Sequence, residues 1–205
     1  ENLRLYLPRG NRAAMRRDVL TWGKDCQDTL LEFQEIIDSG AAEDDGGGEI
    51  TNDGNDEDEW DDFCGGADQY SPSELPVAVA AHRILKCSRG TLMVALHAME
   101  AGGEAVLATN DEERQHAILA WIARLHNLTT VVGEGVTELG FVLYPPLNYP
   151  QLATQLQAQT DAIRNATTCI LSAVDGDVPR ATEKLTNTIE EAEPVIYVRL
   201  ALHPT

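Results

Sequence analysis

The chain has 205 residues, a formal net charge of −19 and a sequence pI near 4.4. This length suits one domain with a substantial core, and the charge argues against binding to nucleic-acid phosphates or to anionic membranes. Residues 43–62 hold eleven acids and no Lys or Arg. The remainder carries 23 acids against 15 bases, so we expect a folded part that is only moderately acidic.

The chain begins at Glu1 rather than Met, which indicates a fragment or a processed form. No apolar run approaches the ~18 residues that a membrane span needs, and none has the form of a signal peptide. Four cysteines, Cys26, Cys64, Cys87 and Cys169, form no CxxC pair. Three of them fall on predicted amphipathic helices, where a free thiol behaves as a small hydrophobic group, so we expect a reducing compartment.

Apolar residues recur at steps of three and four from about residue 11 to residue 38, which predicts a helix. The inward stripe comprises Met15, Val19, Trp22, Cys26, Leu30, Phe33 and Ile37. Ser39 and Gly40 give a stop signal. Residues 41–70 are rich in Gly, Asp, Glu and Asn and cannot bury enough apolar surface to offset the entropy of ordering. We therefore expect an acidic flexible insert within a single domain that spans residues 1–205.

A capping box at residues 71–74 predicts the start of a second helix. Pro76 follows closely, so the regular helix is expected to begin a few residues late. It should run to about Ala101, where Gly102 and Gly103 end it. The inward stripe is formed by small and apolar residues, namely Val77, Ala81, Ile84, Cys87 or Ser88, Thr91, Ala95 and Ala98.

A second capping box at residues 109–112 predicts a third helix that reaches Leu143. Gly133 and Gly135 each weaken it by roughly 1 kcal/mol relative to Ala, so a bend or restart is expected there. The inward residues are Ile118, Trp121, Leu125, Leu128, Val132 and Val136.

Pro145 and Pro146 stop the third helix, and Pro150 suits the first turn of a fourth that runs to about Val174. The inward residues of the fourth are Leu152, Leu156, Ile163, Ala166, Ile170 and Val174. A fifth helix is predicted from Pro179 to about Ala192, anchored by Leu185 and Ile189. Residues 195–202 fit either a short helix or an extended tail. The fold class is all-α, an antiparallel bundle of about five helices.

No pattern predicts a catalytic, cofactor or metal site. None of the five histidines stands in HExxH or has zinc-ligand spacing. The sequence holds no GxxxxGK[ST] phosphate loop and no GxSxG elbow. Residues 53–58 resemble the start of a calcium loop, but Asp58 stands where that loop requires Gly. We therefore predict a protein that is not an enzyme and needs no cofactor.

Arg9, Arg12, Arg16 and Arg17 form the only basic cluster along the sequence. One interpretation is that they are the solvated start of the first helix. The other is that they contact an acidic partner, which includes this protein's own acidic insert. The sequence alone leaves both interpretations open.

Trp60 and Phe63 are the candidate partner-binding residues, because they form an aromatic island inside the acidic insert. Aromatic anchors in charged flexible segments are typical of short recognition motifs, since the acids keep the anchor exposed and steer it to basic surfaces. The alternative is that both rings fold back onto the bundle as a lid, because aromatic side chains gain most from burial.

The end of the third predicted helix and the turn after it carry a resemblance to a known family. Residues 137–146 read Thr-Glu-Leu-Gly-Phe-Val-Leu-Tyr-Pro-Pro and precede a long helix. Residues 8–14, 23–25 and 80–86, together with the acidic stretch before Trp60, fit the same pattern. On these features the chain resembles the C-terminal half of the cyclin-D-binding protein family.

The resemblance implies an all-helical protein without enzymatic activity, located in the cytoplasm and nucleus. Members of that family are linked to D-type cyclins, to a haematopoietic signalling adaptor and to helix-loop-helix transcription factors. They generally act as negative regulators of cell-cycle progression and lack a DNA-binding basic region. The matching motif is structural, so it assigns no individual binding residue.

Three functions are compatible with these features. The first is an interaction module that binds partner proteins through a groove or through the acidic insert. The second is a catalyst, which would need polar residues that converge on the inward faces, whereas the predicted stripes are apolar. The third is a scaffolding bundle of cytoskeletal or adhesion type. The first, acting as a negative regulator of the cell cycle or of transcription, is our prediction.

Overall fold

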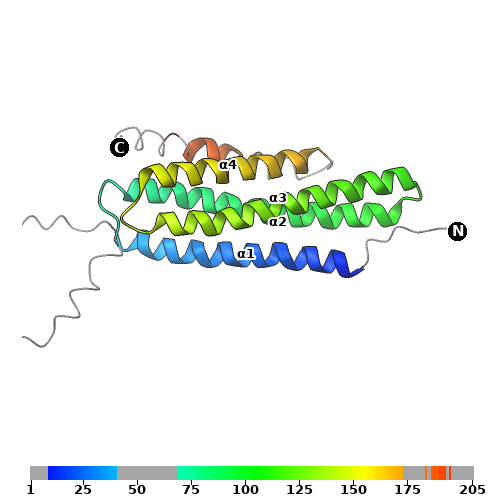
Figure 1. Ribbon diagram of the computed structural model, residues 1–205, viewed down its shortest axis with the longest axis horizontal. Coiled ribbons are helices and arrows are strands. Elements are labelled where there is room, and N and C mark those ends of the chain that lie inside the picture. Colours follow the sequence, from blue (N-terminus) through cyan, green and yellow to red (C-terminus); the bar gives the residue numbers. More distant parts are fainter. Residues whose placement is uncertain (1–8, 41–68, 173–182, 184–185, 193, 195–205) are drawn as a thin grey trace, which may run out of the picture.

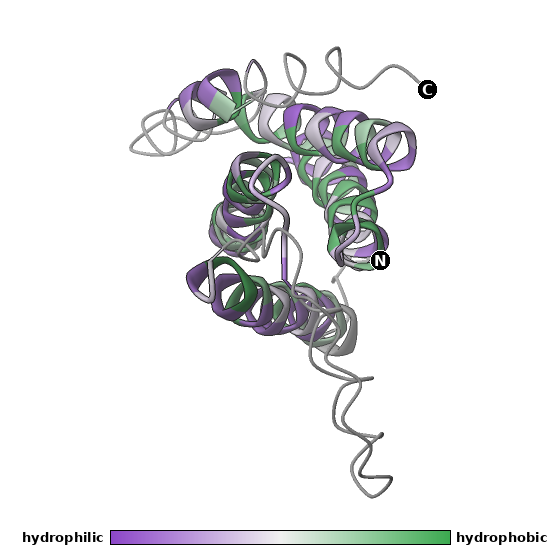
Figure 2. Ribbon diagram, turned by 90° about the vertical axis from the view of Figure 1, so that its left-hand side faces the viewer, coloured by the Kyte–Doolittle hydropathy of each residue, from purple (hydrophilic) through white to green (hydrophobic). Residues whose placement is uncertain are grey.

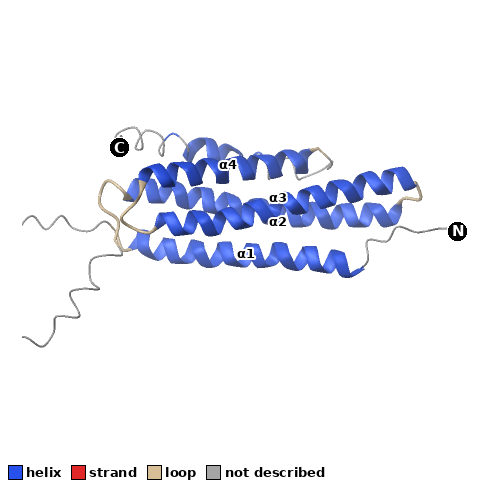
Figure 3. Ribbon diagram, viewed as in Figure 1, coloured by secondary structure: helices blue, strands red, loops and turns tan. Residues whose placement is uncertain are grey.

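The computed structural model describes residues 9–40, 69–172, 183, 186–192 and 194. It contains four long helices, namely α1 (Arg9–Asp38), α2 (Leu75–Ala108), α3 (Glu112–Leu143) and α4 (Tyr149–Leu171). Successive helices run in opposite directions, and the described connections between them are short (Figures 1 and 3). The prediction of an all-α antiparallel bundle is confirmed.

The helices α2 and α3 pack against each other at the centre of the bundle. The helix α1 contacts both of them on one side, and α4 contacts both on the other (Figure 1). Hydrophobic faces of the helices turn toward one another, and hydrophilic faces turn outward (Figure 2). This arrangement leaves α1 with two neighbours among the described helices, so much of its surface is available for contacts outside the bundle.

The predicted inward stripe of α1 is confirmed. Val19, Cys26, Leu30 and Phe33 are buried, and the other stripe residues, Met15, Trp22 and Ile37, are partly buried. The helix ends where the sequence predicts, because Gly40 adopts a φ of +85° that an L side chain rarely allows.

The helix α2 begins at Leu75, a few residues late as predicted from Pro76. The capping box forms in part: the Ser71 amide donates to Glu74 Oε2 at 2.9 Å. The Glu74 amide donates to the backbone carbonyl of Ser71 rather than to its hydroxyl. Glu74 therefore closes the box, and the Ser71 side chain does not.

The prediction that α2 ends near Ala101 is wrong, since the helix continues through Gly102 and Gly103 to Ala108. Both glycines serve close packing instead of termination. A Cβ atom on Gly102 would lie 2.9 Å from Trp121 Cζ3, and one on Gly103 would lie 3.2 Å from Arg12 Cζ. Tertiary contacts thus outweigh the low helix propensity of glycine, which costs ~1 kcal/mol per residue.

The cap of α3 is Asp111 rather than Thr109, which corrects the predicted capping box. The Asp111 carboxylate accepts hydrogen bonds from the amides of Glu113 and Arg114. The Thr109 hydroxyl instead accepts from the Asp111 amide at 3.3 Å. An aspartate at this position also places a negative charge at the positive end of the helix dipole, which stabilises the helix.

The turn between α3 and α4 is tied to the entrance of α2. Tyr70 was predicted to belong to the flexible insert, and this is wrong, because Tyr70 is buried and donates its hydroxyl to the Leu143 carbonyl at 2.6 Å. The Leu147 amide donates to Glu74 Oε1 at 2.6 Å. Asn148 caps α4 by accepting from the Gln151 amide. These hydrogen bonds fix the Tyr-Pro-Pro turn against the rest of the bundle.

The C-terminal predictions are tested in part. The helix α4 ends at Leu171, and its predicted inward residues up to Ile170 are buried. Residues 186–192 are helical, and Ile189 is buried as predicted. Val174, Leu185 and residues 195–202 lie outside the described residues.

The core is divided into two clusters by a polar layer near the middle of the bundle. One cluster includes Leu85 and Val136, and the other includes Leu92 and Val132. Between them Gln159 is buried and donates to Ser88 Oγ at 2.8 Å and to the Val132 carbonyl at 3.0 Å. This layer was not predicted, because a single amide does not disturb an otherwise apolar stripe.

The predicted bend or restart of α3 at its two glycines does not occur. The helix runs without a break through Gly133 and Gly135. A Cβ atom on Gly133 would overlap the Trp22 indole, and one on Gly135 would overlap the Gln159 amide. The glycines are therefore points of close contact with α1 and α4, and α3 neither ends nor restarts there.

Candidate functional site

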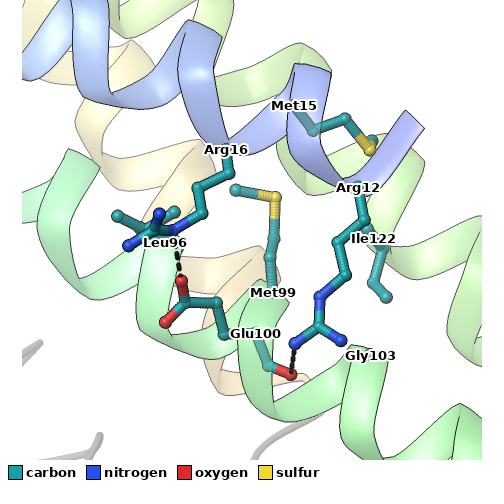
Figure 4. A pocket seen from close by; sticks show the side chains of 8 residues that line it. All are labelled: Arg12, Met15, Arg16, Leu96, Met99, Glu100, Gly103 and Ile122. Atoms are coloured by element: carbon teal, nitrogen blue, oxygen red, sulfur yellow. Dashed lines mark hydrogen bonds and ion pairs between the residues drawn. The ribbon is translucent and has the colours of Figure 1, made fainter. Parts of the chain in front are cut away.

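A small pocket opens between α1, α2 and α3 near the start of α1 (Figure 4). Its volume is about 30 Å³. The lining residues are Arg12, Met15, Arg16, Leu96, Met99, Glu100, Gly103 and Ile122. Gly103 has no side chain to fill the space, so the Arg12 side chain lies directly over the backbone of α2.

The pocket has an apolar floor and a charged rim. The floor consists of Met15, Leu96, Met99 and Ile122, and each of these packs in or against the apolar core. On the rim Arg12 Nη2 lies 2.8 Å from Glu104 Oε1. Arg16 Nε lies 2.8 Å from Glu100 Oε1 (Figure 4).

The ion pairs of the rim show that part of the arginine cluster contacts acidic residues of this protein's own bundle. Arg12 and Arg16 reach across to acids of α2 while their side chains stay partly exposed. Arg17 is exposed, and the side chain of Arg9 lies outside the described residues. Arg12 and Arg16 are therefore more than the solvated start of a helix, since they join α1 to α2 beside the pocket.

The size and lining of the pocket favour one apolar side chain as its occupant. Sites for cofactors and drug-sized ligands are several hundred Å³ on common measures and carry a few convergent polar groups. Here the floor is apolar, and both methionines can change rotamer to fit an incoming group, as methionines do at adaptable binding surfaces. Such a pocket suits the anchor residue of a protein partner.

The polar side chains inside the bundle mostly bond to their own helices. The hydroxyls of Ser88, Thr91 and Thr167 donate to the carbonyls of Ile84, Cys87 and Ile163, each four residues earlier. Such bonds satisfy the hydroxyl where it stands and leave no free group directed at a substrate.

The buried carboxylate of Glu74 and the buried imidazole of His82 stand apart from each other. His82 Nε2 lies 3.0 Å from the Leu30 carbonyl. Burial lowers the pKa of His82, and the hydrogen bond to Leu30 offsets only part of that shift. Burial acts to raise the pKa of Glu74, but the hydrogen bonds from Ser71 and Leu147 outweigh it, so the pKa ends below its usual value. Eight residues of helix separate the two groups by about 12 Å along the axis.

Three cysteines behave as the sequence predicts, as buried apolar side chains. Cys26, Cys87 and Cys169 are free thiols and are buried. Burial raises the pKa of Cys26 to about 12 and that of Cys87 to about 11. Such thiols stay protonated near neutral pH, and the protonated form is a poor nucleophile. Cys64 lies outside the described residues.

Across the described ranges, no three His, Cys, Asp or Glu side chains lie close enough together to hold a metal ion. The nearest pairing is His126 Nε2 with Asp18 Oδ2 at 3.5 Å, between α3 and α1. Among the described helices, none combines the length and apolar character that crossing a membrane requires.

The predicted partner-binding residues Trp60 and Phe63 lie outside the described residues. The structure instead reveals the pocket, which the sequence did not predict. A usable signal was present, because Gly103 and Met99 lie four residues apart and so share a helix face. On α1, Arg12 and Arg16 lie four residues apart and therefore share a helix face, which was a second usable signal for the pocket.

Comparison with known proteins leaves the family unassigned. No protein-family model matches the sequence, and no curated protein matches it. The resemblance to the cyclin-D-binding protein family therefore rests on residues 137–146 and the shorter segments that accompany them. In the structure, residues 137–146 form the end of α3 and the start of the turn into α4.

Proposed function

We propose that this protein is a non-enzymatic interaction module that binds D-type cyclins or helix-loop-helix factors. In this role it acts as a negative regulator of cell-cycle progression or of transcription, in the cytoplasm and nucleus. The pocket between α1 and α2 is the observation that carries the proposal of an interaction module. It is apolar, adaptable and near the surface, as the site for a partner's anchor residue should be.

The choice of partner class is supported by the family resemblance at residues 137–146. The proposal that the protein is not an enzyme is supported by the described interior, where hydroxyls bond to their own helices and the Glu74 carboxylate stands apart from the His82 imidazole. The segment with Trp60 and Phe63 is a second candidate contact, since aromatic residues among acids are typical of recognition motifs.

A pull-down with purified D-type cyclin tests the proposal. The full chain should retain the cyclin, and a helix-loop-helix protein should be assayed in parallel. Failure to retain either partner would overturn the proposed function and leave the scaffolding bundle as the better interpretation. A chain that lacks residues 41–68, and so keeps the buried Tyr70, then locates the contact: loss of binding assigns it to the insert, and retention assigns it to the bundle.

The Trp60→Ala and Phe63→Ala double variant separates recognition from folding. If the two rings contact the partner, binding falls while the thermal unfolding temperature stays nearly unchanged. A large fall in that temperature would show that the rings pack on the bundle as a lid, because loss of buried aromatic groups costs about 3–5 kcal/mol each.

A further inference from the structure

The side of α1 that adjoins α2 presents a continuous exposed face. Leu20, Lys24, Gln27 and Leu31 follow Arg16 at steps of four, four, three and four residues, which places all five on one side of the helix. Arg16 pairs with Glu100 of α2, so this side adjoins α2. We call it, with the neighbouring surface of α2, the α1–α2 face; its α2 residues are Lys86, Arg89, Met93, His97 and Glu100.

Three apolar side chains, Leu20, Leu31 and Met93, lie along this face, and its Arg16 and Glu100 also line the pocket. Leu20 is 41% exposed and Leu31 is 55% exposed, while Met93 is partly buried and covers Gly23. A single exposed leucine is ordinary on a protein surface. Here two lie on one ridge, and the chain's three methionines, Met15, Met93 and Met99, all lie on this face or in the pocket at its end.

Basic side chains outnumber acidic ones among the residues that define this face, although the chain as a whole is strongly acidic. Its one acid, Glu100, pairs with Arg16. Lys24, Lys86 and Arg89 are exposed. Within the described part of the chain, none of the three forms an ion pair. Lys86 and Arg89 lie three residues apart on α2, and Lys24 lies on α1, so the fold brings Lys24 to the same side of the molecule as the other two.

Three of the six acids of α1 lie on its other side. Asp18 pairs with His126 of α3, and Glu32 accepts a hydrogen bond from the Tyr144 hydroxyl. Asp25 falls midway between Asp18 and Glu32 at steps of seven residues, so it shares their side. These three acids therefore lie toward α3, whereas Arg16 lies toward α2. Asp38 follows Leu31 by seven residues and lies on the side of Leu31.

We propose that the α1–α2 face binds an acidic amphipathic helix of a partner protein. One apolar side chain of that helix enters the pocket, its other apolar groups cover Leu20, Met93 and Leu31, and its carboxylates lie over Lys24, Lys86 and Arg89. From Glu100 to Lys86 the face extends for about 21 Å along α2, which matches about 14 residues of helix. The inference rests on the proposed function only in taking the partner to be a protein.

Two designed peptides provide the first test, by fluorescence anisotropy with the full chain at about 0.15 M salt, where the Debye length is about 8 Å. Both have 18 residues and the same leucine stripe. One carries Glu and the other Lys at the flanking positions. The Glu peptide should bind at least about tenfold more tightly. The overall charge of −19 favours the Lys peptide, so tighter binding of the Lys peptide would overturn the proposal.

A charge reversal on the face provides the second test. The Lys86→Glu and Arg89→Glu double variant changes exposed side chains and should weaken the Glu peptide by about tenfold or more. The matched control is the Arg114→Glu and Arg124→Glu double variant, which makes the same charge change at exposed positions of α3. Equal weakening by both variants would overturn the proposal, because the effect would then be one of net charge.

A single-stranded DNA of the same charge as the Glu peptide tests for a general polyanion site. Binding as tight as that of the peptide would overturn the assignment to a protein helix.

The pull-down distinguishes this inference from the proposed function. If wild type and the Lys86→Glu and Arg89→Glu variant retain the cyclin equally, the inference about the α1–α2 face is wrong and the proposed function stands. If the protein binds the Glu peptide but no cyclin, the proposed function is wrong and the inference about the α1–α2 face stands.

Discussion

Gly133 of α3 lies directly against the indole ring of Trp22 of α1, with no room between them for a methyl group. The contact stands at the middle of the bundle, one layer from the buried amide of Gln159 and the hydroxyl of Ser88. It sets how closely α1 approaches α3 and so positions the surface of α1 that forms the α1–α2 face.

Replacing Gly133 with alanine should lower the free energy of unfolding. The added methyl group overlaps the Trp22 ring, and overpacking of this kind costs about 1–3 kcal/mol. The gain in helix propensity is at most ~1 kcal/mol, so the net effect is a loss. Urea unfolding followed by circular dichroism measures it.

Gly140→Ala is the matched control in the same helix. A Cβ atom there would meet Thr29 Cγ2 at 3.5 Å and Phe33 Cε2 at 4.0 Å, which is ordinary contact. The alanine should therefore stabilise the protein by about 0.5–1 kcal/mol. If both substitutions shift stability in the same direction, the close contact between Gly133 and Trp22 is wrong.

The hydrogen bonds of Glu74 predict a loss of stability in acid. Its pKa in the folded protein lies below the ordinary value of 4.5. The carboxylate therefore contributes stability that is fully present above pH 4.5 and is lost as the pH falls through the folded-state pKa. Glu74→Gln should cost about 1–3 kcal/mol near neutral pH and should flatten the acid limb of the stability curve. An unchanged acid limb would contradict this role.

His82 predicts a second pH dependence at higher pH. Burial lowers its pKa below the ordinary value of 6.5, so the unfolded chain takes up a proton before the folded protein does. Stability is therefore fully present above pH 6.5 and falls as the pH is lowered through the folded-state pKa. In His82→Gln, chemical unfolding at a series of pH values should show a smaller fall in this range. A slope equal to that of wild type would contradict the assignment.

Trp121 joins α3 to α4 through its ring nitrogen, which donates to the Cys169 carbonyl at 2.9 Å. Its ring also packs over Gly102 of α2. Because the side chain is only partly buried, Trp121→Ala should cost about 2–4 kcal/mol, toward the lower end for a core tryptophan. Trp121→Phe keeps most of the packing and should lose only about 1 kcal/mol. A loss below about 1 kcal/mol for the alanine variant would mean that the ring contributes little to the bundle.

Much of the fold follows from the spacing of apolar residues. The stripes from Val19 to Phe33 and from Leu152 to Ile170 predict buried faces because a helix repeats every 3.6 residues. Those residues are buried, except for Trp22, which is partly buried. Pro76 and Pro150 also act locally, on their own backbone, so the starts of α2 and α4 could be predicted.

Apart from the cap of α3, where the choice between Thr109 and Asp111 is local, the errors share one physical cause, which is contact between residues distant in sequence. Gly102 was predicted to end a helix, yet it lies inside α2 because Trp121 of another helix needs the space. The polar layer around Gln159 and the pocket around Met99 depend in the same way on residues of three helices. Spacing along one segment does not report which surfaces meet. The basic residues of the α1–α2 face were missed for this reason too.

Isothermal titration of the full chain with a purified D-type cyclin tests the central claim most directly. The account predicts a saturable heat with a single class of site, which the Lys86→Glu and Arg89→Glu variant weakens if the cyclin uses the α1–α2 face. No saturable heat with either a D-type cyclin or a helix-loop-helix protein, up to about 0.1 mM partner, would contradict the proposal that this bundle binds those proteins.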